Sequence, residues 1–509
     1  MSDDRILVWH RADLRTADHA ALAAAVRDGT PAPVFVFDPR YYDERSLGCD
    51  ARRRFLHESL TDLREQYLAR GGDLALRHGD PLAVLEALRE DADALYLNRD
   101  VTAGAARERD CEVLSWEGVE AFADDGIRRP GPDHREADGG VTVDTREGWD
   151  DHCEAYFEGD PAPRPEGLPA NPIDSTTSVE AIEDRYGVDP AKRDVPQGGT
   201  VAGNERLSAF VDRLHEYPGA VSPPAAAEEG SSRLSPYLAF GCLSTRQVYR
   251  RVRDAPESRG RSMLTSRLYW NRHYTQKLAD WPGWTERSVN PVFRGLRADE
   301  HDPELVAAWQ EGRTGFPMVD AAMRALVETG YINFRMRAMC ASVFCYVLRE
   351  WWKRGADFMY KHLVDADAAI NYSQWQSQAG LVGVHPIRVY DPAKQVREYD
   401  PEGAFVRKYV PELAPLPDEH LVRPEKAPLA VQEESGVRIG EDYPYPVVDF
   451  EARADRARDE MARLDDRAKE AIRVPRVNRR ASLSSRGRGR DGGEDTDGPS
   501  QGQASLDEF

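Results

Sequence analysis

Three groups of residues in this chain could carry chemistry, and the first is a loop rich in hydroxyl groups. Residues 231–235 read SSRLS and are followed by Pro236. Serine is a preferred helix N-cap and proline is favoured in the first turn, so we expect a helix with Ser235 as its N-cap. Hydroxyl groups and free N–H groups at a helix start can bind an anion, and Arg233 adds positive charge. Ordinary helix capping explains the same pattern.

The second group is a set of carboxylates in an otherwise apolar stretch, where Asp365 and Asp367 precede Asn371. A buried carboxylate needs a hydrogen-bonding or charged partner. Residues two apart do not share a helix face, so the two aspartates should have different partners. Arg337 lies in a second apolar stretch and is the candidate partner of Asp365. Such a pair could be purely structural or part of a ligand site.

The third group is a set of tryptophans that includes Trp309, Trp352 and Trp375. A tryptophan in a helical core usually serves packing, and the spacing of these three does not by itself indicate electron transfer.

The elements that must position these groups fall into two parts. Residues 1–125 alternate helices with short apolar segments, and the predicted strands are 6–9, 33–37, 74–77 and 95–97. This alternation predicts an open, parallel, Rossmann-like α/β sheet. Residues 126–200 are predicted to be a linker, and 201–464 a large helical domain. Residues 465–509 are charged and then rich in Arg, Gly and Ser, which predicts a disordered tail.

Composition restricts the class of protein. A chain of 509 residues is too long for one hydrophobic core, so at least two domains are expected. It has no long apolar run that predicts a membrane span and no signal-peptide pattern at its start. The six cysteines include no Cys-x-x-Cys pair, which argues against zinc ribbons, iron–sulfur clusters and disulfide scaffolds. We expect a cytoplasmic, monomeric protein without a metal.

The net charge of −21 would ordinarily argue against a nucleic-acid partner. Acidic residues are spread along the chain and lysine is scarce, which is typical of a salt-adapted protein. At molar salt the Debye length is only about 3 Å, so this charge is almost fully screened. Residues 261–361 nevertheless hold more Lys and Arg than Asp and Glu. The sequence therefore predicts a local anion site.

Taken together, these segments resemble the DNA photolyase/cryptochrome family over residues 5–125 and 201–412. The resemblance is carried by five segments in the family's order, VWHRADLR at 8–15, SSRLSPYL at 231–238, WQEGRTGFPMVDAAMR at 309–324, DAD at 365–367 and RVYDP at 388–392. Residues 331–337 and 371–376 are similar to an archaeal and bacterial branch of that family.

The resemblance implies that the helical domain binds FAD. The residues that it assigns to the cofactor are Tyr217, Ser231, Ser232, Arg233, Leu234, Ser235, Arg337, Asp365, Ala366, Asp367 and Asn371. The ion pair of Arg337 with Asp365 would lie over the isoalloxazine, and Asp367 would accept a hydrogen bond from the ring edge. Asn371 would lie beside flavin N5.

The resemblance also gives the tryptophans a role. Trp375, Trp352 and Trp309 would form an electron relay that runs from the flavin to the protein surface. Tryptophan is the aromatic side chain that is easiest to oxidise, so such a relay could refill a photo-excited flavin.

Four residues would face damaged DNA, namely Arg267, Trp270, Phe334 and Arg335. Trp270 would stack on an extruded base. Repair enzymes of the family usually carry Glu where this chain has Arg267, Arg where it has Asn271 and Asn where it has Phe334. These departures leave the lesion type open, with a cyclobutane dimer and a 6-4 product as the alternatives.

The function implied first is a deoxyribodipyrimidine photolyase that splits pyrimidine dimers in DNA. A cryptochrome photoreceptor that signals to a protein partner is the main alternative, and an electron-transfer flavoprotein without photochemistry is a weaker one. A second, antenna chromophore of unknown identity belongs to this interpretation. The α/β domain is shortened near residues 107–114, where a helix that helps hold the antenna is expected to be missing.

The chain ends in Gln503, Leu506 and Phe509, after a stretch of Gly, Ser and Arg. This spacing resembles the short peptide by which DNA-repair proteins dock on sliding clamps. Short motifs also arise by chance in tails, so a sliding clamp remains one alternative for the role of residues 503–509.

Overall fold

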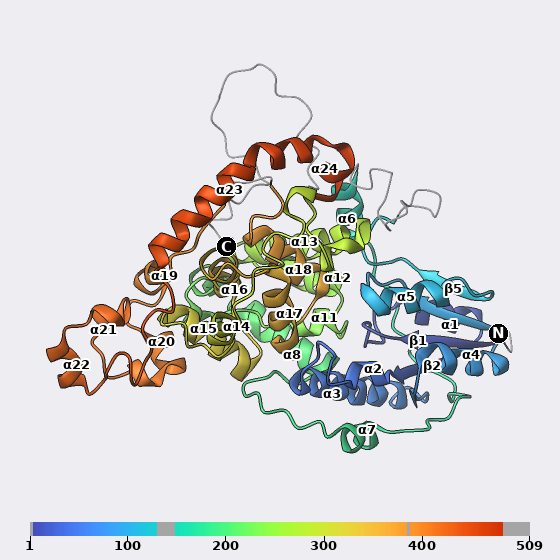
Figure 1. The fold of residues 1–509 in the computed structure, drawn as a ribbon. Helices are drawn as coiled ribbons and strands as arrows, with labels where there is room; N and C mark the ends of the chain where they lie inside the picture. The colour runs from blue at the N-terminus through green and yellow to red at the C-terminus, as the bar shows by residue number, and fades with distance from the viewer. Residues whose placement is uncertain (1–3, 130–147, 384–386, 482–509) are drawn as a thin grey trace.

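The computed structural model describes residues 4–129, 148–383 and 387–481. It has an N-terminal α/β domain and a larger helical domain, joined by a segment that runs back along the α/β domain (Figure 1). No helix among these described residues is long and apolar enough to cross a membrane.

The N-terminal domain is an open parallel sheet, as the sequence predicts, with the strand order β3-β2-β1-β4-β5 and a fifth strand that the sequence analysis did not identify. The strands are β1 (Arg5–His10), β2 (Thr30–Phe37), β3 (Ala75–His78), β4 (Ala94–Asn98) and β5 (Val119–Phe122). The helices between them are α1 (Ala20–Asp28), α2 (Pro39–Tyr42), α3 (Asp50–Leu68), α4 (Pro81–Leu88) and α5 (Gly104–Val113).

Two apolar cores, one on each side of the sheet, explain why its central strands read as continuous apolar runs. Ile6 and Val8 of β1 pack into the core shared with the helical domain, whereas Leu7 and Trp9 pack into the core on the other side. Side chains alternate in direction along a strand, so a sheet covered on both faces needs apolar residues at every position.

The expectation that a helix is missing near residues 107–114 is wrong. Helix α5 occupies the connection between β4 and β5, and Val113 is fully buried in the core against that face of the sheet. Parallel strands need a crossover connection, and α5 supplies it with only ten residues.

The linking segment is packed against both domains rather than suspended between them. It contains α6 (Trp149–Glu158) and α7 (Val179–Tyr186). Phe157 of α6 stacks on Tyr249 of the helical domain, with ring centroids 4.7 Å apart. Tyr186 of α7 stacks on Tyr42 of the α/β domain at 4.3 Å.

The helical domain is built around one large core that includes two helices at residues 317–329 and 334–342 and a turn of π-helix at Val343–Val347. Its first helices are α8 (Thr200–Asp212), α9 (Tyr217–Ala220), α10 (Pro224–Gly230), α11 (Ser235–Ala239), α12 (Thr245–Arg253) and α13 (Arg259–Asp280). Its middle helices are α14 (Pro303–Gln310), α15 (Pro317–Thr329), α16 (Phe334–Ser342), α17 (Trp352–His362) and α18 (Ala368–Gln378). The last are α19 (Pro392–Tyr399), α20 (Ala404–Tyr409), α21 (Asp418–Leu421), α22 (Leu429–Ser435), α23 (Phe450–Arg473) and α24 (Pro475–Ala481).

The predicted start of the tail at residue 465 is also wrong, because α23 continues to Arg473 and α24 follows it. Helix α23 is strongly charged, yet Ala454, Ala457, Met461 and Ala468 lie at helical spacing and are buried. This amphipathic helix was not predicted from the sequence because of its high content of charged residues. The helix packs along the top of the helical domain in Figure 1. Residues 482–509, including the clamp-like residues Gln503, Leu506 and Phe509, lie outside the described residues.

Candidate functional site

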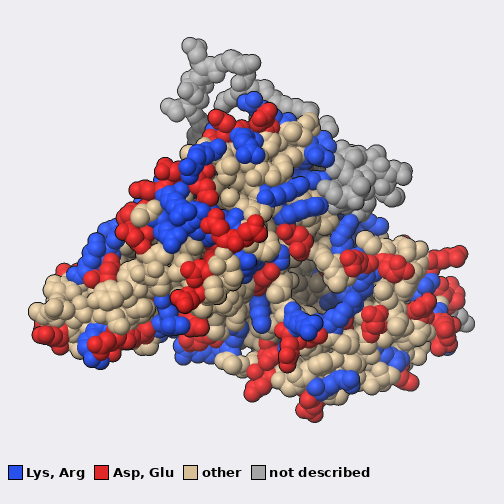
Figure 2. Space-filling view, viewed as in Figure 1, with Lys and Arg blue, Asp and Glu red and all other residues tan. Residues whose placement is uncertain are grey.

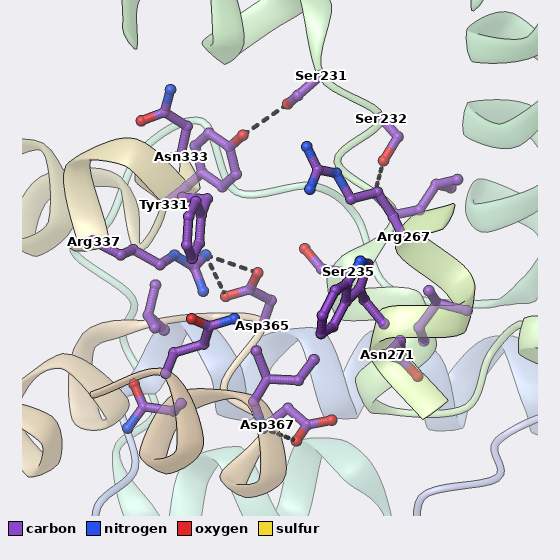
Figure 3. Close-up of a pocket in the computed structure, with 18 of the residues that line it drawn as sticks. Ser231, Ser232, Ser235, Arg267, Asn271, Tyr331, Asn333, Arg337, Asp365 and Asp367 are labelled. Carbon is purple, nitrogen blue, oxygen red and sulfur yellow. Dashed lines mark hydrogen bonds and ion pairs between the residues drawn. The ribbon is translucent and has the colours of Figure 1, made fainter. Parts of the chain in front are cut away.

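A cavity of about 320 Å³ in the helical domain gathers most of the residues singled out from the sequence. The cofactor candidates that line it are Tyr217, Ser231, Ser232, Arg233, Leu234, Ser235, Arg337, Asp365, Asp367 and Asn371. Figure 3 shows the serine-rich loop facing Tyr331 and Arg337 across the space, with Asp365 and Asp367 on the loop that leads into α18. Segments more than 100 residues apart in the sequence thus meet at one site.

The serine-rich loop is tied to the cavity wall at Tyr331. Ser231 Oγ and the Tyr331 hydroxyl lie 2.8 Å apart, and the Arg233 guanidinium stacks 3.9 Å from the centre of the Tyr331 ring. Arg233 has a φ of +51°, an uncommon conformation for a side chain other than glycine. This bend presents the hydroxyl groups of the loop to the cavity.

The helix after this loop begins one position earlier than predicted. Ser235 is the first residue of α11, and Leu234 occupies the N-cap position without a side-chain capping bond. The predicted role of Ser235 as the N-cap is therefore wrong. Its hydroxyl group lines the cavity instead.

Arg337 and Asp365 form the ion pair that the sequence predicted. Arg337 Nη2 donates to both carboxylate oxygens of Asp365, at 3.1 and 2.9 Å. Arg337 Nε donates to the backbone oxygen of Ile332 at 2.9 Å, which fixes the orientation of the guanidinium. The Asp365 side chain is 7% exposed and that of Arg337 is 23% exposed, so the pair is largely withdrawn from water.

Asp367 and Asn371 lie at the start of α18. Asp367 is the N-cap of this helix and accepts a hydrogen bond from the Ile370 backbone N–H at 3.0 Å. Burial raises the pKa of Asp367, so a hydrogen-bond donor or a positive charge in the cavity would favour its ionised form. Asn371 donates from Nδ2 to the backbone oxygen of Ala356 at 3.1 Å, which anchors its amide to α17.

Two buried polar atoms of residues that line the cavity, Gln374 Oε1 and Trp375 Nε1, have no hydrogen-bond partner within the described part of the chain. Buried polar atoms are rarely left unsatisfied, so such atoms are expected where a bound group completes a site. The donors of Arg337, the carboxylate of Asp367 and the apolar side chains of Leu234 and Ile370 suit a ligand with an aromatic ring and anionic groups, and FAD fits this description.

The candidate DNA-facing residues Arg267 and Trp270 of α13 line the same cavity, as do Asn271 and Phe334. The Trp270 ring stacks on Tyr274, with centroids 5.8 Å apart and 29° between the planes. Sequence reasoning missed Tyr274, although it follows Trp270 by four residues and so shares its helix face.

Other lining residues were missed for a different reason. Tyr331, Asn333 and Gln374 line the cavity, but nothing in their own sequence spacing indicates a site. Tyr331 and Asn333 lie shortly before Arg337 in the chain, and Gln374 directly precedes Trp375. The segments that contain Arg337 and Trp375 therefore bring these residues into the cavity.

Four of the predicted site residues do not line this cavity, namely Ala366, Arg335, Trp352 and Trp309. Ala366 lines a second cavity on the other side of its loop. Arg335 lies with its guanidinium 3.9 Å from the centre of the Tyr399 ring. Trp352 is buried beside Tyr372 on α18.

The predicted route of the relay to the surface through Trp309 is wrong. Trp309 is fully buried, its Nε1 donates to the backbone oxygen of Cys340 at 3.3 Å, and its ring packs on Phe344 at 4.6 Å. Its ring centroid also lies only 6.1 Å from that of Trp375. Trp309 is thus a core residue next to Trp375, and the sequence could not show which face of α14 is buried.

The second cavity, of about 460 Å³, lies between the α/β domain and the helical domain. Arg11 and Arg15 line it from the N-terminal side, and Tyr360 and Tyr372 line it from the helical side. Asp367 lines both cavities, so the loop before α18 separates them. In Figure 2, Lys and Arg side chains border a hollow near the junction of the two domains.

His10, Asp13 and His19 form a buried cluster at the carboxyl end of β1, with ligand-type atoms within 4.8 Å of one another. His19 Nδ1 accepts a hydrogen bond from the Leu22 backbone N–H at 3.0 Å, and Nε2 lies 3.0 Å from Asp13 Oδ2. A neutral imidazole that accepts at Nδ1 carries its proton on Nε2, the nitrogen that lies beside the Asp13 carboxylate. Burial lowers the pKa of His19 to about 4, in keeping with a neutral ring. Contacts between the side chains, together with the hydrogen bonds of His10 to the Asp13 backbone oxygen and to Tyr67, thus account for the cluster.

Comparison with known proteins agrees with this geometry. A family model described as the FAD-binding domain of DNA photolyase matches residues 263–463, and one described as DNA photolyase matches residues 6–165. Cryptochrome DASH of Natronomonas pharaonis is 33% identical over 88% of this chain and 99% of its own length. Deoxyribodipyrimidine photo-lyase of Halobacterium salinarum is 32% identical over 89% of this chain and 97% of its own length.

Among solved structures, the archaeal photolyase of Sulfolobus tokodaii, determined with two FAD molecules, superimposes with a TM-score of 0.72 at 26% identity. The match covers 90% of this chain and 100% of that chain. The chain therefore belongs to the DNA photolyase/cryptochrome family of FAD flavoproteins.

Proposed function

We propose that the protein is a deoxyribodipyrimidine photolyase, which uses blue light to split pyrimidine dimers that ultraviolet light forms in DNA. The observation that carries this proposal is one cavity lined both by the Arg337–Asp365 pair and by the aromatic side chain of Trp270. A ring held by the ion pair and a base stacked on Trp270 would share a single, largely apolar space. Electron transfer between them would then need no movement of the protein.

The proposed cofactor is FAD, which when bound would supply light absorption and one-electron chemistry. Ser231, Ser232 and Arg233 would bind its phosphates through hydroxyl groups and positive charge. The Arg337–Asp365 pair would lie against its ring, and Asp367 would accept a hydrogen bond from a ring N–H. Tyr217, Leu234, Ser235 and Asn371 complete the proposed set.

On the DNA side, Trp270 would stack on the extruded lesion, with Arg267 and Phe334 beside it. Extrusion costs least at damaged bases, whose stacking and pairing are already weakened. Arg267 offers only hydrogen-bond donors and a positive charge, so it would bind carbonyl or phosphate oxygens of the lesion. The lesion itself, a cyclobutane dimer or a 6-4 product, stays open.

Two tryptophans are proposed to recharge the cofactor. Trp375 lines the FAD cavity, and Trp352 is buried on the adjacent helix α17. Trp375 would lose an electron first and would be refilled from Trp352.

Two further partners belong to the proposal. A second, antenna chromophore would occupy the cavity between the domains, whose lining combines arginines such as Arg15 with aromatic side chains such as Tyr360. The two FAD molecules in the Sulfolobus tokodaii structure support a site for a second chromophore in this fold. A sliding clamp bound through residues 503–509 remains a proposal about residues that the structure does not describe.

The test is repair of ultraviolet-irradiated oligonucleotides by the purified, FAD-loaded protein, with one sample in blue light and one in the dark. The proposal predicts loss of dimers in the light only. Assays with defined cyclobutane and 6-4 substrates would assign the lesion. If neither substrate is repaired while FAD is bound and reduced, the protein is not a photolyase.

A cryptochrome photoreceptor is the second candidate. It is favoured by the 33% identity to the cryptochrome DASH of Natronomonas pharaonis and by Arg267 at a position where repair enzymes of the family usually carry Glu. A photoreceptor should bind its protein partner differently in the light and in the dark, without any repair of DNA. Light-dependent changes in partner binding that persist in Trp270→Ala would favour this function.

A further inference from the structure

A row of contacting aromatic rings leads from Trp352 through Tyr372 to Tyr360, toward the cavity between the domains. The positions of the tryptophans alone do not indicate this route. The Trp352 ring lies 6.3 Å from Tyr372 in an edge-to-face contact. Tyr372 in turn stacks on Tyr360, with ring centroids 5.6 Å apart and 23° between the planes. Tyr360 is only partly buried, and both tyrosines line the cavity between the domains. The row of rings therefore ends at that cavity.

Helix packing connects this row of rings to the proposed FAD site. Tyr372 and Trp375 lie three residues apart on α18, so they share one side of the helix. On α17, Gly355 follows Trp352 by three residues, and a β-carbon at Gly355 would lie only 2.4 Å from the Trp375 ring. The missing side chain at Gly355 thus allows the backbone of α17 to pack closely against the Trp375 ring.

Tyr372 differs from the tryptophans because its proton has a defined acceptor. The Tyr372 hydroxyl donates to Asp357 Oδ1 at 2.7 Å, a length typical of a hydrogen bond to a charged carboxylate. Lys353 lies 2.7 Å from both oxygens of Asp357 and holds the carboxylate in place. Burial raises the pKa of Tyr372, and the negative charges of Asp357 and Glu286 raise it further.

We propose that Tyr372 is a redox-active residue of the relay, which gives its electron to oxidised Trp352 and its proton to Asp357. This inference rests on the proposed light-driven reduction of FAD. With FAD bound and excited, Trp375 would give up one electron and would be re-reduced by Trp352, so that Trp352 would be left oxidised by one electron. One electron then moves from Tyr372 to Trp352, and the phenolic O–H bond breaks. A new O–H bond forms at Asp357 Oδ1, which leaves a neutral tyrosyl radical and a neutral carboxylic acid.

Two features of the site favour this step. A phenol that loses an electron becomes a strong acid, and Asp357 is already hydrogen-bonded to accept the proton. Since the electron can return to Tyr372 only together with its proton, charge recombination is slowed. The radical would thus be held next to the cavity between the domains rather than in the core beside Trp309.

The test is electron paramagnetic resonance of the oxidised, FAD-loaded protein after a pulse of blue light. A tyrosyl spectrum is expected in the wild type and should be lost in Tyr372→Phe, which keeps the ring and removes the proton. Asp357→Asn should also abolish it, because the amide cannot take up the proton. The matched control is Tyr346→Phe, because Tyr346 is fully buried and its hydroxyl has no hydrogen-bond partner among the described residues.

Two measurements need no variant and so do not depend on its folding. Ring-deuterated tyrosine should narrow the light-induced spectrum of the wild type, and D₂O should slow the appearance of the tyrosyl radical but not the first loss of an electron from tryptophan. A radical that stays on tryptophan, or a tyrosyl spectrum that persists in Tyr372→Phe, would overturn the assignment of Tyr372 while leaving photoreduction intact. A wild type in which light reduces no flavin would contradict the light-driven function itself, and the role of Tyr372 with it.

Discussion

At the scale of single residues, the ion pair between Arg337 and Asp365 should decide how firmly the cofactor is held. Asp365→Asn removes the negative charge and leaves Arg337, 23% exposed, without its counter-charge. We expect a loss of about 1–3 kcal/mol in stability, the usual cost of an unsatisfied buried polar group, and weaker binding of FAD. Thermal unfolding and FAD titration measure both. Glu398→Gln, which breaks the exposed pair with Lys394 on α19, is the control and should change neither.

Trp375 should matter for recharging the cofactor rather than for binding it. Trp375→Phe is expected to abolish photoreduction of the oxidised flavin while FAD stays bound, because phenylalanine fills most of the same space but is much harder to oxidise. Absorption spectra recorded under blue light follow the reaction. Loss of FAD from this variant would show that Trp375 serves mainly in packing.

Trp270 should matter for DNA and not for the flavin. Trp270→Ala is expected to cost about 1–3 kcal/mol of binding to damaged DNA, the usual value of a base stacked on an aromatic side chain. A titration with an ultraviolet-damaged duplex gives this number. Tyr445→Ala removes an aromatic residue that is 58% exposed and does not line the cavity, so it should leave binding unchanged.

Residue identity and the physics of burial predicted part of this site. A carboxylate in an apolar stretch needs a partner, and this requirement alone indicated Arg337 for Asp365. The same reasoning could not reveal Asp357 and Tyr372, which are hydrogen-bonded only because α17 and α18 pack side by side. Nor could it show that Trp309 is buried, because the orientation of α14 is set by tertiary packing. The direction in which Ala366 points depends on the path of a loop and has no sequence signal.

At the scale of elements, α23 is an integral part of the helical domain. Glu460 of this helix bridges Arg297 and Arg349, both largely buried. Burial alone would raise the pKa of Glu460, but the two arginines outweigh it and the pKa is lowered. A lowered folded-state pKa means that the stabilisation is present above about pH 4.5, the ordinary value, and is lost as the pH falls through the folded value.

Glu460→Gln should therefore destabilise the protein by about 3 kcal/mol near neutral pH, because the buried Arg297 loses its counter-charge and Arg349 keeps only its pair with the half-exposed Glu300. The difference from the wild type should shrink as the pH falls below 4.5. Urea unfolding across this range measures it. Glu451→Gln, a change on the same helix that breaks an exposed pair with Arg423, is the matched control and should show a small, nearly constant difference.

Helix α23 also shows where composition misleads. Its charged residues and the Arg-rich stretch that follows predicted disorder from residue 465. A helix that packs on a domain surface needs only one apolar face, however, so a high content of charge is compatible with an ordered helix. The parallel sheet, in contrast, was predictable, because strands buried on both faces leave a continuous apolar signal.

At the scale of the whole molecule, the net charge of −21 makes the folded state sensitive to salt. Like charges spread over a compact surface repel one another, and screening weakens this repulsion as the Debye length falls from about 10 Å at 0.1 M to about 3 Å at 1 M salt. We expect the melting temperature to rise over this range. A neutral sugar at the same osmolarity controls for solvent exclusion, and an equal rise in both would contradict an electrostatic origin.

The central claim is that one cavity brings a flavin and a damaged base together for light-driven repair. Its most direct test is a single-turnover repair assay with chemically pre-reduced protein, comparing wild type, Trp375→Phe and Trp270→Ala. Wild type and Trp375→Phe should split dimers equally in blue light, since the proposed relay serves only recharging, and Trp270→Ala should repair far less at the same DNA concentration. Full repair by Trp270→Ala, or no repair by pre-reduced wild type, would contradict it.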